Sequence, residues 1–148
     1  MAKFVYKMQN ILNLKEKIES QEKIAFAEAT RAYNDEQEKL QNLFMRQAGY
    51  ENALRELMDN TSIDVAEITH MRSAITTIKQ MIRDQMFVLQ RAQAVMEQAR
   101  RRMEEATKER KMHEKLREHA FEDFKKELIA EDNKAIDQLV SFTYSPNR

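Results

Sequence analysis

The sequence of 148 residues contains no cysteine and no tryptophan, and it has only one glycine and one proline. Sheet proteins need glycine, proline and asparagine at the tight turns that join their strands. One glycine and one proline are too few for several strands, which excludes sandwiches, barrels and doubly wound sheets with glycine-rich phosphate loops. The absence of cysteine excludes disulfides, thiolate zinc sites and thiol nucleophiles, and it is compatible with a reducing compartment.

The chain also lacks an excess of either charge, because 25 basic residues balance 25 acidic ones. General electrostatic attraction to nucleic acid or to an anionic membrane is therefore not expected. No apolar stretch approaches the roughly 18 residues that a membrane span needs, and the first residues lack the apolar core of a secretory signal. We expect a cytoplasmic protein that binds no nucleic acid and does not insert into a membrane.

The residues that are abundant indicate a coiled coil. Hydrophobic residues make up 42% of the chain and charged residues 34%, which is typical of long helices. From Ile68 to Ala106, steps of alternately three and four residues meet an apolar side chain at every position except Gln85. Such a heptad pattern predicts a helix with one apolar seam. The pattern weakens at about residues 110–113 and resumes at about residue 120.

The first third of the chain carries a similar pattern in two phases, joined at Ala29 by two consecutive steps of four residues. A stutter of this kind unwinds a supercoil locally without ending the helix. We therefore expect one continuous helix from about residue 4 to about residue 58. The first phase comprises Phe4, Ile11, Leu14, Ile18, Gln21 and Ala25, and the second comprises Tyr33, Leu40, Leu43, Gln47, Tyr50, Leu54 and Leu57.

Small polar residues cluster between the two heptad runs, at residues 59–64. Asp64 followed by Glu67 resembles a capping arrangement, which places acidic charge at the positive end of the next helix. The sequence thus predicts a turn at about 59–63, a second helix at about 64–142 and a frayed tail at 143–148. The fold class is all-α: residues 1–148 form a single domain, a long antiparallel coiled-coil hairpin whose second helix overhangs the first. A parallel homodimer is the rival, since heptads alone do not choose orientation.

No group of residues indicates catalysis or metal binding. His113 and His119 are six residues apart, whereas the zincin motif needs histidines four apart, so we expect solvated or seam histidines. The basic run at residues 100–102 has glutamates three or four residues away, which favours a salt-bridged solvent face over a nucleic-acid site. A two-helix protein offers no concave pocket that excludes water. We therefore expect no enzyme, no metal and no cofactor.

Two motifs stand near the two ends of the chain. The first is Phe4 followed by Met8-Gln9-Asn10-Ile11-Leu12-Asn13-Leu14-Lys15-Glu16-Lys17. The second is Glu109-Arg110-Lys111-x-x-Glu114-Lys115-Leu116 followed by Glu131-x-x-Lys134-x-Ile136-Asp137-Gln138-Leu139. Both motifs resemble those of the flagellar export protein FliJ family. The resemblance extends over the whole chain and includes its length and hairpin layout.

The resemblance implies a non-enzymatic, soluble component of the flagellar type III protein export apparatus, which serves flagellum biogenesis and motility. Such a protein would bind the export ATPase ring as a stalk-like activator and couple it to the cytoplasmic domain of the export gate and to export chaperones. It would associate peripherally with the membrane-bound apparatus at the cytoplasmic face of the cell membrane. The residues alone also allow a structural coiled-coil spacer or a homodimerising module with no ATPase partner.

The resemblance further implies two partner-binding surfaces. We call the first the terminal surface, and assign it to the ATPase; a frayed tail or a self-association surface is the alternative. We call the second the turn-proximal surface, and assign it to the export gate. The terminal surface comprises Phe4, Met8, Phe121, Phe124, Leu128, Ile136 and Leu139. The turn-proximal surface comprises Leu43, Arg46, Tyr50, Met71, Ile75 and Ile78.

Overall fold

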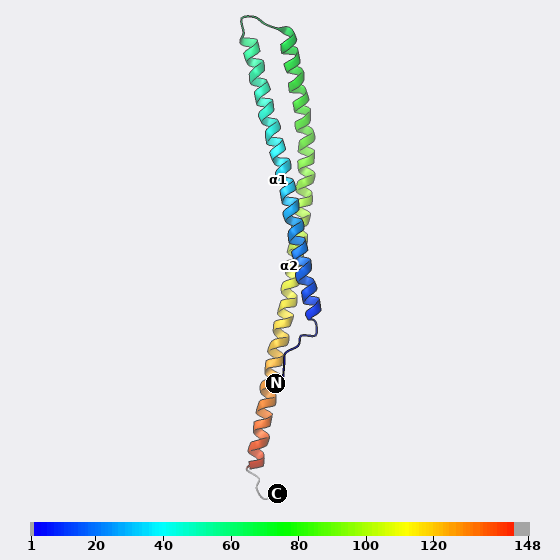
Figure 1. The fold of residues 1–148 in the computed structure, drawn as a ribbon, viewed down its shortest axis with the longest axis vertical. Coiled ribbons are helices and arrows are strands. Elements are labelled where there is room, and N and C mark those ends of the chain that lie inside the picture. Colours follow the sequence, from blue (N-terminus) through cyan, green and yellow to red (C-terminus); the bar gives the residue numbers. More distant parts are fainter. Residues whose placement is uncertain (1, 144–148) are drawn as a thin grey trace. The chain divides into compact units, whose positions relative to one another are not determined.

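The structure, a computed structural model, describes residues 2–143. It consists of helix α1 (Gln9–Asp59) and helix α2 (Val65–Thr143), which pack together as a hairpin (Figure 1). α2 has 79 residues and α1 has 51, so the second helix is the longer one. The expected all-α hairpin with unequal helices is confirmed. The expected tail lies outside the described residues from 144 onward.

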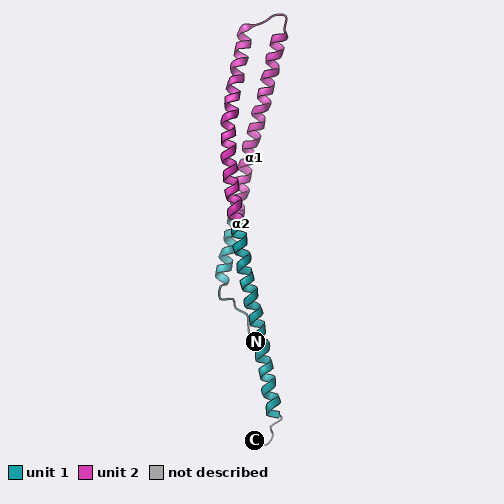
Figure 2. Ribbon diagram, turned by 180° about the vertical axis from the view of Figure 1, so that it is seen from behind, with its two compact units in different colours: residues 1–21, 104–148 teal, residues 22–103 magenta. Residues whose placement is uncertain are grey.

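The chain divides into two compact units along the paired helices. Figure 2 shows residues 1–21 with 104–148 as unit 1, and residues 22–103 as unit 2. Unit 1 therefore contains the first turns of α1 beside the C-terminal half of α2, and unit 2 contains the turn between the helices. The single-domain assignment remains a prediction.

α1 begins at Gln9, not at about residue 4 as the sequence predicted. The backbone amide of Gln9 donates to the carbonyl oxygen of Tyr6 at 3.2 Å, and residues 2–6 have no helical hydrogen bonds of their own. The reason is the side chain of Phe4, which packs on two aromatic rings of α2. Each such ring pair stabilises the fold by about 0.5–1.5 kcal/mol beyond the effect of its buried area. This stabilisation is greater than that from a further turn of solvent-exposed helix.

Asp64 caps the start of α2 as the sequence predicted. Its Oδ1 accepts hydrogen bonds from the backbone amides of Ala66 at 3.0 Å and Glu67 at 3.3 Å. These amides have no partner within the helix, so the aspartate satisfies two donors and places its charge at the positive helix end. The helix accordingly begins at Val65, one residue after the cap.

The predicted seam of α2 is confirmed. Every position reached by the alternating steps from Ile68 to Ala106 is buried or half-buried, and Ile78 is only 1% exposed. Ile75 and Ile82, one turn to either side of Ile78, are buried as well. These isoleucines form the best-packed part of unit 2.

The predicted stutter in α1 is wrong. Buried and half-buried positions follow unbroken steps of three and four residues, whereas Leu14 of the expected first phase is exposed. The apolar pattern was misleading because charged side chains, among them Lys15 and Glu19, occupy seam positions. The observed seam comprises Leu12, Lys15, Glu19, Glu22, Phe26, Ala29, Tyr33, Glu36, Leu40, Leu43, Gln47, Tyr50, Leu54 and Leu57.

Ion pairs across the seam hold the two helices of unit 1 together. Lys15 Nζ lies 2.8 Å from a carboxylate oxygen of Glu109. The buried carboxylate of Glu19 accepts a hydrogen bond of 2.8 Å from Arg110 Nε, and Arg110 also pairs with Glu114 at 2.7 Å. The hydrogen bonds to Glu19 and Glu114 raise the pKa of Arg110, and the hydrogen bond from Lys15 lowers the pKa of Glu109.

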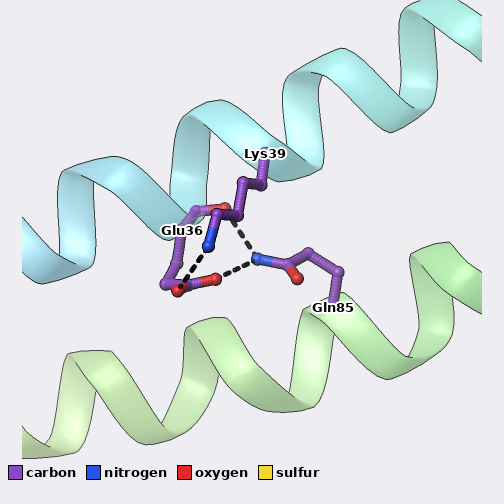
Figure 3. A network of polar contacts seen from close by, with 3 residues as sticks. All are labelled: Glu36, Lys39 and Gln85. Atoms are coloured by element: carbon purple, nitrogen blue, oxygen red, sulfur yellow. Dashed lines mark hydrogen bonds and ion pairs between the residues drawn. The ribbon is translucent and has the colours of Figure 1, made fainter.

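Gln85, the polar position in the seam of α2, has partners on α1 in unit 2. Its side-chain amide donates to the backbone carbonyl oxygen of Glu36 at 3.0 Å and also to the Glu36 carboxylate (Figure 3). Lys39 approaches the same carboxylate at 3.2 Å. The hydrogen bond from Gln85, and then that from Lys39, lowers the pKa of Glu36. A buried amide without partners would be costly, so this network explains why glutamine is tolerated here.

The difference in burial along α2 predicts unequal effects of two identical truncations. Ile78→Ala should lower the free energy of unfolding by about 2–5 kcal/mol, because it leaves a cavity in the seam. Ile136→Ala, at an exposed position, should lower it by less than about 0.5 kcal/mol. Urea unfolding followed by circular dichroism measures both. Equal losses would contradict the packing described for unit 2.

The lowered pKa of Glu36 predicts a dependence of stability on acid. A carboxylate that ionises more readily in the folded chain favours folding above its ordinary pKa, and this contribution is lost as the pH falls below about 4.3 toward the lowered value. Between about pH 6 and about pH 3, the range in which carboxyl groups titrate, the melting temperature of Glu36→Gln should therefore fall less than that of the unaltered chain. Glu38→Gln, at an exposed position on the same helix, is the matched control and should follow the unaltered chain.

Candidate functional site

Four residues of the terminal surface lie close together in unit 1. The ring centroid of Phe4 is 5.1 Å from that of Phe121, with the rings at 67°, and 5.5 Å from that of Phe124, with the rings at 50°. Edge-to-face and tilted arrangements at this distance are favourable for aromatic rings. Met8 follows on the same N-terminal segment. We call residues 2–8 the strap, because this segment runs from α1 back onto α2.

Charged side chains hold the strap in place. The guanidinium of Arg117 lies 5.5 Å from the ring centroid of Phe4, and its Nε donates to the Oε1 of Gln9 at 2.9 Å. Arg117 thus contacts both the strap and the first turn of α1. The ammonium of Lys125 lies 4.9 Å from the ring centroid of Phe121. The hydroxyl of Tyr6 is buried without a hydrogen-bond partner among residues 2–143.

A groove of about 460 Å³ separates part of the strap from α2. Its walls are mainly apolar, but Lys7 stands on the strap side and two carboxylates stand on the α2 side. The groove can therefore receive an apolar side chain flanked by a charge of either sign. The lining residues are Phe4, Val5, Tyr6, Lys7, Met8, Ala120, Asp123, Phe124 and Glu127.

The remaining residues of the terminal surface lie farther along α2. Leu128 is half-buried, one turn beyond Phe124, whereas Ile136 and Leu139 are exposed. Ile136 is roughly 18 Å from Phe124 at 1.5 Å per residue. Every residue from 129 to 143 is exposed. The seven predicted residues therefore form an aromatic cluster and an apolar stripe that continues from it, and their binding role remains a prediction.

The turn-proximal surface is only partly accessible. Ile75 and Ile78 are buried in the seam of unit 2, and Leu43, Tyr50 and Met71 are half-buried. Arg46 is exposed, and its Nη2 donates to the hydroxyl of Tyr50 at 3.2 Å. The two isoleucines pack within the hairpin and offer a partner almost no surface. The accessible part of this surface is centred on Arg46 and Tyr50.

Two grooves border Tyr50 and the turn. One of about 240 Å³ runs beside Arg46 and Tyr50, and another of about 440 Å³ lies nearer the turn; His70 lines both. His70, Ala74 and Thr77 were not predicted as site residues, although each sits one residue before a seam position of α2 and this spacing could have identified them. The α2 residues that line the first groove are His70, Ser73, Ala74, Thr77, Ile78 and Met81.

Residues 2–143 show few features of any other kind of functional site. Within residues 2–143, no group of three or more His, Cys, Asp or Glu side chains could hold a metal ion. His113 is half-buried at the seam, which is one of the two positions expected for the histidines. Its Nδ1 has no hydrogen-bond partner among residues 2–143. Arg100 pairs with Glu97 at 2.7 Å and lowers the pKa of that carboxylate, which agrees with the expected salt-bridged face. No helix in the same range is long and apolar enough to cross a membrane.

Comparison with known proteins identifies the family. The family model described as "Flagellar FliJ protein" matches residues 4–148, so the chain belongs to the FliJ family. Membership implies a component of flagellar or type III export, with partners in the export apparatus, from a family that is generally non-catalytic. The resemblance noted in the sequence is thus confirmed.

A solved structure shares the fold. It is that of a YscO homolog, CT670, from Chlamydia trachomatis, and it is 20% identical to this chain. The match covers 99% of this chain and 100% of the other, with a TM-score of 0.52. No curated protein sequence matches significantly.

The contacts of Phe4 predict how firmly the strap is held. Phe4→Ala removes two ring pairs worth about 0.5–1.5 kcal/mol each, so the strap should open roughly tenfold more often. Trypsin cleavage after Lys3 and Lys7, followed by mass spectrometry under native conditions, should accelerate by a similar factor. Val5→Ala changes an exposed residue of the same segment and should leave the rate unchanged. Equal rates for both variants would show that Phe4 does not hold the strap.

Proposed function

We propose that this member of the FliJ family binds the export ATPase through its terminal surface and activates it as a stalk-like component. The observation that carries the proposal is the aromatic cluster of the strap and α2, which leads directly into a helical segment with every residue exposed. Exposed apolar side chains gathered on one element are typical of binding surfaces. Family membership supplies the export apparatus as the setting.

The exposed stripe offers enough apolar area for binding. Ile129, Ile136 and Leu139 are exposed and spaced by seven and three residues, which places them on one side of α2. Covering each of them with a partner contributes about 1.5–3 kcal/mol before ordering costs. The groove beside the strap adds a second point of contact for an apolar side chain. A partner that surrounds the end of α2, such as a ring, would use both.

Activation in this proposal needs no chemistry from the chain itself. A protein that binds the assembled ATPase ring more tightly than the separate subunits shifts the population toward the ring. The catalytic groups then belong to the ATPase, and this chain contributes differential affinity. The size of the activation is limited by that difference in affinity.

The turn-proximal surface is the proposed contact for the cytoplasmic domain of the export gate. Because Ile75 and Ile78 are buried, the contact would involve Arg46 and Tyr50 with the groove beside them. Export chaperones are further proposed partners. The protein would then work at the cytoplasmic face of the membrane, in peripheral association with the export apparatus.

A double substitution on the exposed stripe tests the ATPase contact. Ile136→Ser with Leu139→Ser should weaken binding to the cognate export ATPase, and the stimulation of its turnover, by roughly tenfold or more, because two apolar contacts are lost. The side chains are 56% and 67% exposed, so folding should be unaffected. Calorimetry measures binding, and phosphate release measures turnover.

The matched control lies in unit 2. Ile24 and Met45 are 60% and 66% exposed, and their replacement by serine should leave ATPase binding unchanged. Binding of the gate's cytoplasmic domain should survive the α2 substitutions. If the Ile24 and Met45 variant no longer binds the ATPase while the Ile136 and Leu139 variant still binds it, the assignment of the terminal surface is wrong. If the unaltered chain neither binds nor stimulates the ATPase, the spacer alternative is favoured.

A further inference from the structure

α2 carries a second apolar surface in unit 2, apart from the seam that faces α1. Phe87 is 63% and Val95 59% exposed, and Val88 is also exposed. Between Asp84 and Met96 the charged side chains are Asp84 and Arg91. Exposed apolar side chains gathered on one side of a helix are typical of interaction surfaces.

The spacing of these residues forms a second seam. Asp84, Val88, Arg91 and Val95 are separated by four, three and four residues, so they lie along one side of α2. Each sits one residue before a position of the first seam, which α1 occupies. Phe87 lies beside Val88 at the edge of this row. We call the set Asp84, Phe87, Val88, Arg91 and Val95 the 84–95 patch.

We propose that the 84–95 patch binds the same patch of a second copy of this chain, with the two α2 helices antiparallel. A two-fold axis between Phe87 and Val88 places Asp84 opposite Arg91 of the second copy. By symmetry, Arg91 lies opposite the other Asp84, so the contact contains two opposite-charge pairs. Val88 then packs against the other Phe87 between these pairs. The proposal is independent of the proposed function in export.

The charges select both the occupant and the orientation. In a parallel arrangement in register, Asp84 would face Asp84 and Arg91 would face Arg91, and both like-charge contacts would be repulsive. The antiparallel arrangement pairs each charge with its opposite, so no protein other than a second copy of this chain is needed. The contact covers only about three turns of helix, so its buried area is well below the roughly 1,600 Å² of a standard interface. The dimer is accordingly weak and forms at high protein concentration.

Charge reversal tests the pairing. In sedimentation equilibrium, the dimer dissociation constant should rise roughly tenfold for Asp84→Arg and for Arg91→Asp, because each change creates two like-charge contacts in the symmetric dimer. Combining both changes restores opposite charges and should return the constant to within about threefold of the starting value. Both side chains are exposed, so circular dichroism should report unchanged helicity for all three variants.

Cysteine cross-linking tests the orientation, because the chain has no cysteine of its own. Val88→Cys places the two thiols beside the two-fold axis, and oxidation should link the dimer. Val95→Cys lies on the same stripe, but in the antiparallel dimer its two copies are about 22 Å apart at 1.5 Å per residue, too far for a disulfide. A parallel dimer would link through both positions.

Three outcomes overturn the proposal. The first is a chain that remains monomeric up to millimolar concentration. The second is a dimer whose dissociation constant is insensitive to either charge reversal. The third is cross-linking of Val95→Cys as efficiently as Val88→Cys. None of these results alters the ATPase measurements with the Ile136 and Leu139 variants, so the two proposals succeed or fail separately.

Discussion

Burial along a narrow seam is the constraint on which the other features of this protein depend. A pair of helices can hide only one stripe of each helix, at alternating steps of three and four residues. Among residues 2–143, the buried apolar side chains are accordingly few: Leu12, Ile75, Ile78, Ile82 and Ala106. Most other apolar side chains remain at least partly exposed. The protein therefore has ample surface for partners.

Polar residues within the seam contribute specificity more than stability. The buried ion pair of Glu19 with Arg110 loses much of its Coulomb attraction to the desolvation of both charges. A shift of α1 along α2 would, however, separate the buried Glu19 from Arg110, which is far more costly. Glu36 and Gln85 act alike in unit 2. These pairs favour one register of the hairpin, which a purely apolar seam would leave less defined.

The sequence predicts the parts of the fold that rest on apolar periodicity or on local capping, and not the parts that rest on distant contacts. The seam of α2 and the Asp64 cap follow from residues close to one another in the chain. The seam of α1 was misread, because Glu19 is recognisable as a seam residue only when Arg110 is known to lie opposite. The sequence grouped Phe4 with Phe121 and Phe124 but did not predict the non-helical course of the strap, which depends on contacts more than a hundred residues apart in the chain. Ile75 and Ile78 belong to the predicted seam of α2, and their burial narrows the turn-proximal surface inferred from the family.

The long exposed end of α2 has a thermodynamic consequence for any partner. An isolated helix is only marginally stable in water, and most helices depend on the packing of one face. Residues 129–143 are all exposed, so this segment gains little from packing within the chain. A partner that covers Ile136 and Leu139 would therefore stabilise the helix as well as bury apolar surface. Part of the binding free energy is then spent on ordering the segment. The affinity of the terminal surface thus depends on helix propensity along α2 as well as on the side chains that touch the partner, and a change to glycine at a non-contacting position there would also weaken binding.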